Sequence, residues 1–229
     1  TKLLKLVKKR DKVEVTFDHS DKLVHEFDTI IMATGIMGNV EELGIENLNI
    51  SVKGSHIQTD SFCRTNIDNI FAIGDVAGAP WLAHKASHEG VQVAELIAGH
   101  KVIPIEPYKI PGCTFSFPQI ASVGYTEKIA SELGYKVKIG KFPFIANGKA
   151  LAIGGSEGFI KTIFDSKTGE LIGAHMIGTE VTELIHSYVL GKQLETTEED
   201  LIDTVFPHPT LSEMLHESTL NAFGRGIHF

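Results

Sequence analysis

The chain contains 229 residues, of which 42% are hydrophobic and 22% charged, and this ordinary globular mixture can bury a core. Its formal net charge of −8 argues against a nucleic-acid partner. No apolar stretch approaches the roughly 20 residues that span a bilayer, so we expect a soluble protein without a membrane partner.

The N-terminal region is predicted to consist of strands. Residues 13–17 and 23–27 alternate between apolar and polar side chains on either side of a turn at residues 18–22, which predicts a hairpin. The continuous apolar run at residues 29–34 predicts a buried strand. Gly35 ends this predicted strand.

A second buried strand is predicted at residues 69–74, and it stops at Asp75. A helical pattern begins shortly afterwards, with small and apolar side chains on one face, and Gly99 ends it. The residues on that face are Ala86, Gly90, Val93, Ala94 and Ile97. Residues 103–110 contain two prolines and are interpreted as a linker.

The rest of the chain has an α+β pattern, which begins with a short helix between Thr126 and Gly134. Strands are predicted at residues 135–142, 158–165 and 170–177, and helices at residues 181–192, 198–205 and from 211 onward. A turn at residues 165–169 joins the last two strands.

Metal ligands are not arranged in a recognisable pattern. Cys63 and Cys113 are the only cysteines, and their spacing fits neither a metal site nor a redox pair, so we expect buried thiols in a reducing compartment. His84 and His88 lie on one helical face, but no third ligand completes a site. We therefore expect no metal.

One segment near the C-terminus places a histidine between two prolines. Pro207 and Pro209 restrict the backbone around His208, because proline fixes its own φ and limits the residue before it. Thr210 and Glu213 have capping-box spacing, which puts Glu213 at a helix start near the imidazole. A carboxylate bonded to one ring nitrogen would hold the other nitrogen as a base, so both residues are candidate catalytic groups. The alternative is a capped helix entrance with an ordinary surface histidine.

Other positions are candidate ligand contacts. Asp75 follows a predicted strand end, where open α/β sheets bind ligands. Its carboxylate could accept a hydrogen bond from a ribityl or ribose hydroxyl. The alternative is that it caps the following turn. The next four candidates open a helix, so their N–H groups lack intrahelical partners and could donate to a ligand carbonyl or remain solvated. They are Trp81, Leu82, Ala83 and His84. At Gly35 a cofactor could approach the backbone closely.

Three segments together resemble one family. They are the Ala33-Thr-Gly35 strand end, residues 69–90 with Ile-Gly-Asp75 and Leu-Ala-His-Lys-Ala86, and the terminal His208-Pro-Thr-Leu-Ser-Glu213 motif. In order and separation they are similar to the C-terminal half of the dihydrolipoamide dehydrogenases, flavin-dependent members of the pyridine nucleotide-disulfide oxidoreductase family. The resemblance covers nearly the whole chain. It favours these enzymes over glutathione, trypanothione or mercuric reductases.

The resemblance implies a role for each candidate residue. His208 matches the base that takes the proton from dihydrolipoamide, and Glu213 matches its orienting carboxylate, with a cis peptide bond between His208 and Pro209. Asp75 matches a residue that bonds the flavin ribityl chain, and residues 81–84 match the run whose backbone faces the flavin ring. Gly35 matches a glycine at the nicotinamide dinucleotide site.

The resemblance also implies a fold and a set of partners. An α+β dimerisation domain, an antiparallel sheet with helices, is expected at residues 107–229. Residues 1–34 would be the end of an NAD-binding domain and residues 35–106 the returning part of an FAD-binding domain, an incomplete α/β portion. In this family the histidine reaches the redox disulfide of the partner subunit, which implies a homodimer. The implied partners are lipoyl domains of 2-oxoacid dehydrogenase complexes, in a bacterial cytoplasm or a mitochondrial matrix.

Two signatures of the family do not occur in this sequence. They are the Gly-x-Gly-x-x-Gly loop and the Cys-x-x-x-x-Cys redox disulfide, and Ile36-Met-Gly-Asn39 stands where many members have an arginine-containing stretch. We therefore expect a truncated chain that dimerises, does not hold FAD usefully and is inactive alone. Two alternatives stay open: a non-catalytic dimerisation or interaction module, and another flavin disulfide reductase, such as a glutathione reductase-like enzyme.

Overall fold

The computed structural model describes residues 2–18 and 24–229. The chain divides into two compact units, Thr1–Asn39 and Val40–Phe229. Within the described residues, no helix is both long and apolar enough to cross a membrane.

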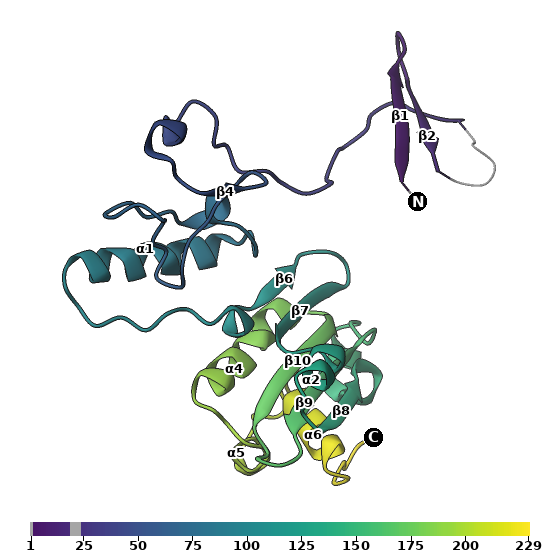
Figure 1. Cartoon of the computed structure of the whole chain (residues 1–229). Coiled ribbons are helices and arrows are strands. Elements are labelled where there is room, and N and C mark those ends of the chain that lie inside the picture. Colours follow the sequence, from purple (N-terminus) through teal and green to yellow (C-terminus); the bar gives the residue numbers. More distant parts are fainter. Residues whose placement is uncertain (1, 19–23) are drawn as a thin grey trace. The chain divides into compact units, whose positions relative to one another are not determined.

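The first unit is an antiparallel sheet with the order β1-β2-β3. Figure 1 labels its strands β1 and β2. Its strands are β1 (Leu3–Lys8), β2 (Val13–Phe17) and β3 (Val24–Phe27). The pairing of β2 with β3 confirms the predicted hairpin, although residues 19–23, with most of its turn, lie outside the described residues. Strand β1 lies in the region predicted to consist of strands, but no bounds were predicted for it, because its sequence Leu-Leu-Lys-Leu-Val-Lys lacks strict alternation.

The apolar run at residues 29–34 is not a strand, so the prediction of a buried strand there is wrong. Ile31 and Met32 are 87% and 56% exposed. A strand needs hydrogen-bond partners on a neighbouring strand, and the described residues place none beside this run. Gly35 therefore follows an irregular segment and not a strand end.

The second unit begins with short elements and one long helix. These are the strands β4 (Val52–Lys53) and β5 (His56–Ile57), the 3₁₀ turns η1 (Ile45–Leu48), η2 (Gly74–Ala77) and η3 (Pro107–Lys109), and the helix α1 (Ala83–Ile97). The strand predicted at residues 69–74 is wrong. Phe71 makes a single bridge to Arg64, and Gly74 already belongs to η2.

The predicted helix is confirmed in α1, but its buried face is not the predicted one. Lys85, Glu89 and Gln92 are buried, whereas Ala94 and Ile97 on the predicted apolar face are exposed. Because each of these three polar side chains has hydrogen-bond partners, the helix can bury them without unsatisfied groups.

The remainder of the second unit is built on a five-stranded antiparallel sheet with the order β6-β7-β10-β9-β8 (Figure 1). Its strands are β6 (Gly112–Thr114), β7 (Gln119–Gly124), β8 (Val137–Pro143), β9 (Phe159–Asp165) and β10 (Leu171–Gly178). The other elements are α2 (Glu127–Glu132), η4 (Phe144–Ala146), α3 (Gly148–Ala152), α4 (Val181–Gln193), α5 (Glu198–Asp203) and α6 (Glu213–Ala222). The expected α+β fold, an antiparallel sheet with helices, is confirmed.

The sheet buries different side chains on its two faces. Ile160 and Phe164 of β9 join the main core with α4 and α6, while Ile163 between them packs with Ala130 of α2 on the other face. In β10 an irregularity between residues 171 and 173 shifts this alternation, so Leu171 still faces the main core.

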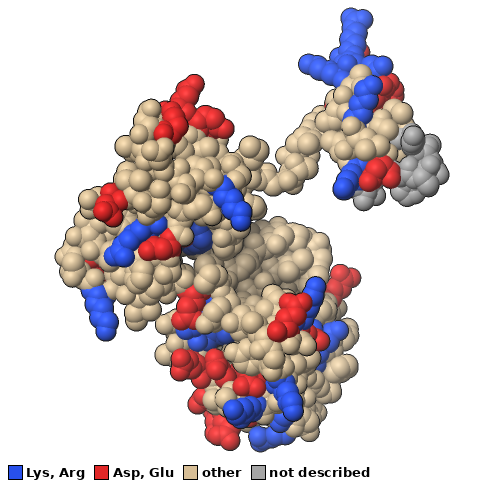
Figure 2. Space-filling model, in the orientation of Figure 1, with Lys and Arg blue, Asp and Glu red and all other residues tan. Residues whose placement is uncertain are grey.

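Charge is distributed unevenly over the chain. Figure 2 shows mostly Lys and Arg on the β1–β2 hairpin, whereas both signs are mixed on the visible face of the second unit. The excess of acidic residues therefore lies in residues 40–229.

Candidate active site

His208 and Glu213 lie together at the start of α6. Imidazole Nδ1 is 2.9 Å from Glu213 Oε1, and Oε2 accepts a hydrogen bond from the backbone N–H of Thr210, also at 2.9 Å. The Glu213 carboxylate therefore fits both interpretations of the sequence, the histidine–carboxylate pair and the capped helix entrance. One oxygen satisfies the backbone at the helix entrance and the other binds the histidine.

The protonation of the pair follows from these contacts. Partial burial raises the pKa of Glu213, but hydrogen bonds from Thr210 and His208 outweigh burial and hold this pKa below the usual value. An ionised carboxylate only accepts hydrogen bonds, so Nδ1 of His208 carries the hydrogen and Nε2 is the basic nitrogen. The His208 side chain is 80% exposed, which leaves Nε2 accessible to a substrate.

The backbone around the pair agrees with the proline argument in part. The peptide bond between His208 and Pro209 is cis, as expected. The predicted capping box is only half formed, because the Thr210 hydroxyl donates to the carbonyl of Pro207 at 2.7 Å and Ser212 is the N-cap. The helix body therefore begins at Glu213.

The pair lines a cavity of about 610 Å³. Further titratable side chains line the same cavity, and sequence reasoning did not identify them as site residues. They are Asp203, His216, Glu217 and His228. The one local signal for Glu217 was its position one turn after Glu213 on the same helix.

Asp75 lies in the η2 turn, which packs against α1. Gly74, at φ 72°, donates its N–H to Glu89 Oε2 at 2.8 Å, and a Cβ at Gly74 would be 3.3 Å from that of Ala86. The positive φ and this tight spacing both favour a glycine at this position of the turn. Asp75 is exposed, and no hydrogen bond to its carboxylate forms within the described part of the chain. It can accept from a ligand.

A buried ion pair supports this turn. Lys85 Nζ is 2.7 Å from Glu89 Oε1, and the two side chains are 9% and 12% exposed. Lys85 also donates to the carbonyl of Gly78 at 3.4 Å, so the pair contacts both ends of the turn. Opposite charges four residues apart normally indicate a solvated helix face, which is why sequence reasoning missed this pair.

The predicted helix opening is displaced by two residues. Helix α1 starts at Ala83 with Leu82 as its N-cap, so Trp81 and Leu82 precede the helix. The first backbone bond joins the N–H of Ala86 to the carbonyl of Leu82, so the N–H groups of residues 83–85 have no intrahelical acceptor. They remain available to an acceptor on a ligand.

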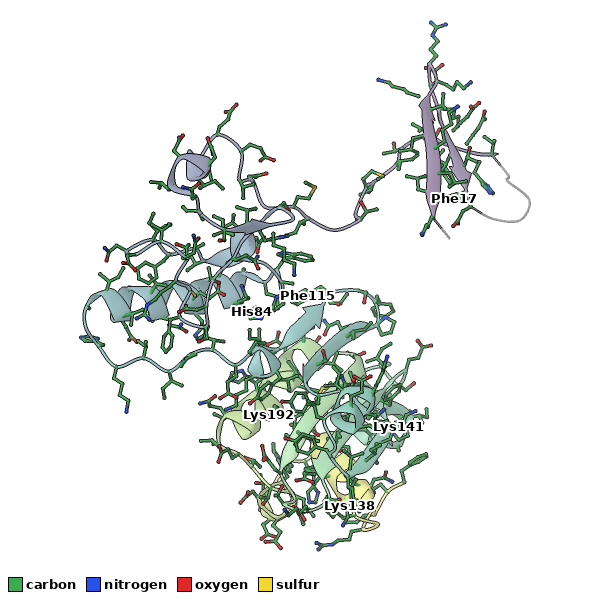
Figure 3. The ribbon with its side chains drawn as sticks, viewed as in Figure 1. Phe17, His84, Phe115, Lys138, Lys141 and Lys192 are labelled. Carbon is green, nitrogen blue, oxygen red and sulfur yellow. The ribbon has the colours of Figure 1, made fainter. Side chains whose placement is uncertain are left out.

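The side chains next to this helix start are already engaged. Trp81 Nε1 donates to His56 Nε2 at 3.1 Å, and His84 Nε2 lies 2.8 Å from the carbonyl oxygen of Pro111. Figure 3 shows His84 at the N-terminal end of α1. It is the backbone, and not these rings, that is free to contact a ligand here.

The candidate residues fall into separate groups. Asp75 and residues 81–84 lie around η2 and the start of α1, and none of them lines the cavity that contains His208. Gly35, at φ 106°, belongs to the first unit. Among the described residues, no three His, Cys, Asp or Glu side chains are grouped to hold a metal ion.

Two long segments of the chain match one family. Residues 2–90 match the pyridine nucleotide-disulphide oxidoreductases, and residues 110–219 match the dimerisation domain of the same proteins. The chain belongs to this family. The second matched segment corresponds to the family's dimerisation domain.

Curated relatives in this family are bacterial dihydrolipoyl dehydrogenases. The enzyme of Zymomonas mobilis subsp. mobilis is 56% identical over 89% of this chain and 44% of its own length. That of Rhizobium etli is 50% identical over 98% of this chain and 47% of its own length. The chain therefore spans about half the length of the curated relatives it matches.

Solved structures show the same fold. LpdA from Mycobacterium tuberculosis superposes with a TM-score of 0.88 at 26% identity, over 95% of this chain and 47% of that one. The HOCl-induced flavoprotein disulfide reductase RclA from Escherichia coli superposes with a TM-score of 0.84 at 25% identity, over 95% of this chain and 50% of that one. The expected family, fold and α+β dimerisation domain are confirmed.

Proposed function

We propose that this chain is the C-terminal half of a dihydrolipoyl dehydrogenase. Such an enzyme oxidises protein-bound dihydrolipoamide to lipoamide and reduces NAD⁺ by way of a redox disulfide and FAD. The observation that carries the proposal is the His208–Glu213 pair, a base with an orienting carboxylate, in a chain whose bacterial relatives are dihydrolipoyl dehydrogenases.

His208 acts as the base in this proposal. Oxidation of a dithiol to a disulfide releases protons together with electrons, and the attacking species is a thiolate. Nε2 of His208 takes a proton from the substrate thiol, and Glu213 stabilises the resulting imidazolium through Nδ1. The cysteines that the thiolate attacks belong to a segment that is not in this sequence.

The residues around η2 suit a flavin dinucleotide. Asp75 would accept hydrogen bonds from the ribityl hydroxyls. The run Trp81, Leu82, Ala83 and His84 would hold the flavin ring through the backbone N–H groups at the start of α1. A bound FAD would supply the electron transfer between the redox disulfide and NAD⁺. Gly35 lies at the nicotinamide dinucleotide site in this proposal.

The domain organisation is part of the same proposal. Residues 1–34 end an NAD-binding domain, residues 35–106 complete an FAD-binding domain, and residues 107–229 form the dimer interface. The active enzyme is a homodimer in which His208 serves the partner subunit's disulfide. Its substrates are lipoyl domains of 2-oxoacid dehydrogenase complexes, in a bacterial cytoplasm or a mitochondrial matrix.

The 229-residue chain by itself is expected to dimerise, to lose FAD on purification and to lack activity, because much of the flavin pocket and the redox disulfide lie outside it. Sedimentation and the visible absorbance of the purified chain test this. A yellow chain that retains flavin through gel filtration contradicts the expectation.

The proposed function is tested in an enzyme that joins this chain to its N-terminal half. His208→Gln should lower turnover with dihydrolipoamide by about 10² to 10⁴, the usual contribution of a positioned acid–base group. His100→Gln, at an exposed position on the second unit, is the control and should leave turnover unchanged. Near-normal turnover in His208→Gln refutes the role of His208.

The second candidate is a flavin disulfide reductase with another substrate, which the structural similarity to RclA favours. Turnover of the joined enzyme with dihydrolipoamide and with glutathione disulfide separates the two. A preference for glutathione disulfide would select the second candidate.

A further inference from the structure

The last residues of the chain are held by one buried carboxylate. Glu217 Oε2 accepts hydrogen bonds from the backbone N–H groups of Ile227 and His228, both at 3.3 Å, and its Oε1 lies 2.7 Å from Nδ1 of His228. The Glu217 side chain is only 7% exposed. Phe229 adds an edge-to-face contact with the buried ring of Phe142. These contacts fix the C-terminal segment against α6 and β8.

The contact between Glu217 and His228 repeats the one between Glu213 and His208. Both glutamates lie on α6, one turn apart, and each binds the Nδ1 atom of a histidine through Oε1. Two like charges at this spacing repel each other unless each has a partner. The four side chains line the same cavity. The cavity therefore contains two histidine–carboxylate pairs side by side.

The two pairs differ in what holds the histidine. His208 lies in a proline-restricted segment next to its carboxylate in sequence, while His228 comes from the chain end and is placed by Glu217. Since Glu217 also engages the backbone N–H groups of residues 227 and 228, it determines where the His228 ring lies. The His228 ring is in turn 67% exposed toward solvent.

We propose that Glu217 and His228 are positioning residues of the site built on His208. Glu217 fixes the C-terminal segment as one wall of the cavity, and it thereby holds the His228 ring in the lining that the His208–Glu213 pair shares. The proposal rests on His208 being the base of the proposed function. The groups that face this arrangement are those of the cavity lining: Asp203, His208, Glu213, His216, Glu217 and His228.

An electrostatic effect of His228 on Glu213 supports the proposed positioning role. Burial acts to raise the pKa of Glu213, and the contacts that lower it include the charge of His228 after those of Thr210 and His208. Replacing His228 by glutamine removes this contribution and should raise the pKa of Glu213. A purely structural clamp would have no such effect.

The first experiment uses the 229-residue chain and needs no activity. We expect Glu217→Gln to speed hydrogen exchange at the amides of Ile227 and His228 by about tenfold, because a bond to a charged acceptor is replaced by one to a neutral acceptor. Glu199→Gln, at an exposed position of α5, is the matched control and should leave both amides unchanged. Unchanged exchange in Glu217→Gln overturns the anchoring role.

The second experiment titrates the Glu213 carboxyl carbon by NMR in the same chain. His228→Gln should raise the Glu213 pKa, and His100→Gln should not. An unchanged Glu213 pKa in His228→Gln, whatever happens to the C-terminal segment, overturns the positioning role of His228.

In the joined enzyme, His228→Gln should lower kcat several-fold while flavin absorbance and dimer mass stay as in the unsubstituted protein. A kcat equal to that of His100→Gln would again overturn the positioning role. The test of Glu217 and His228 can be distinguished from the test of the proposed function. If His208→Gln keeps its turnover, the proposed function fails, whereas the exchange and titration experiments still report on Glu217 and His228.

Discussion

Replacing Lys85 by methionine should destabilise the region around the η2 turn more than removal of both charges does. In the folded chain Glu89 has two partners, Lys85 Nζ at 2.7 Å and the N–H of Gly74 at 2.8 Å. In Lys85→Met the Glu89 carboxylate, which is only 12% exposed, keeps the Gly74 N–H as its remaining partner. An uncompensated buried charge of this kind costs about 3 to 5 kcal/mol.

The double variant Lys85→Met/Glu89→Gln should cost less. The glutamine carbonyl can still accept from Gly74, and no buried charge is left without a partner. The remaining loss is then that of neutral hydrogen bonds, about 1 to 2 kcal/mol. The matched control is Lys128→Met, which removes the exposed pair of Lys128 with Glu132 at the same helical spacing and should cost less than about 1 kcal/mol.

The assay is urea unfolding followed by tryptophan fluorescence. Trp81 is the only tryptophan and contacts His56 close to this turn, so its emission reports on this part of the second unit. With a urea dependence of roughly 1 to 3 kcal/mol per molar, Lys85→Met should lower the midpoint by about 1 M or more. A midpoint equal to that of Lys128→Met, or a double variant less stable than Lys85→Met, refutes the argument from burial.

Three further outcomes are expected. Gly140→Ala should lower the free energy of unfolding by about 1 to 3 kcal/mol, because a Cβ there would overlap the backbone carbonyl oxygen of Ser218 and push α6 from β8; an unchanged melting temperature contradicts this packing. Tyr188→Phe should cost about 1 to 2 kcal/mol, since the fully buried hydroxyl lies 3.0 Å from Ser218 Oγ and 3.2 Å from the Leu215 carbonyl that it bonds; denaturant unfolding of the two proteins measures the difference. Glu213 has a folded-state pKa below its unfolded one, so its contribution to stability is present above the ordinary glutamate pKa of roughly 4.3 and is lost as the pH falls through the folded value. Unfolding curves of the wild type and Glu213→Gln should therefore converge in acid, and a constant difference at all pH values would show that the carboxylate is not linked to folding.

Local sequence was sufficient for features whose partners are close along the chain. The proline-restricted segment around His208 and its spacing to Glu213 predicted the histidine–carboxylate contact, since a few residues contain the whole arrangement. The cis bond between His208 and Pro209 was expected from the family resemblance. The antiparallel strands from 137 to 178 were predicted for the same reason: alternation and short turns are visible in each segment alone. Their residue bounds differ from the predicted ones by only a few positions.

Tertiary structure decided the features that depend on distant partners. The apolar run at residues 29–34 has the composition of a buried strand, yet no neighbouring strand pairs with it in the described chain. On α1, the side chains that are buried are Lys85 and Glu89, because Gly74 and Gly78 supply hydrogen bonds that no helical pattern reveals. The contact of Glu217 with His228 likewise joins the helix to the chain end. A pattern of hydrophobicity records the cost of exposing a side chain, whereas these outcomes depend on which polar partners the fold brings within hydrogen-bond distance.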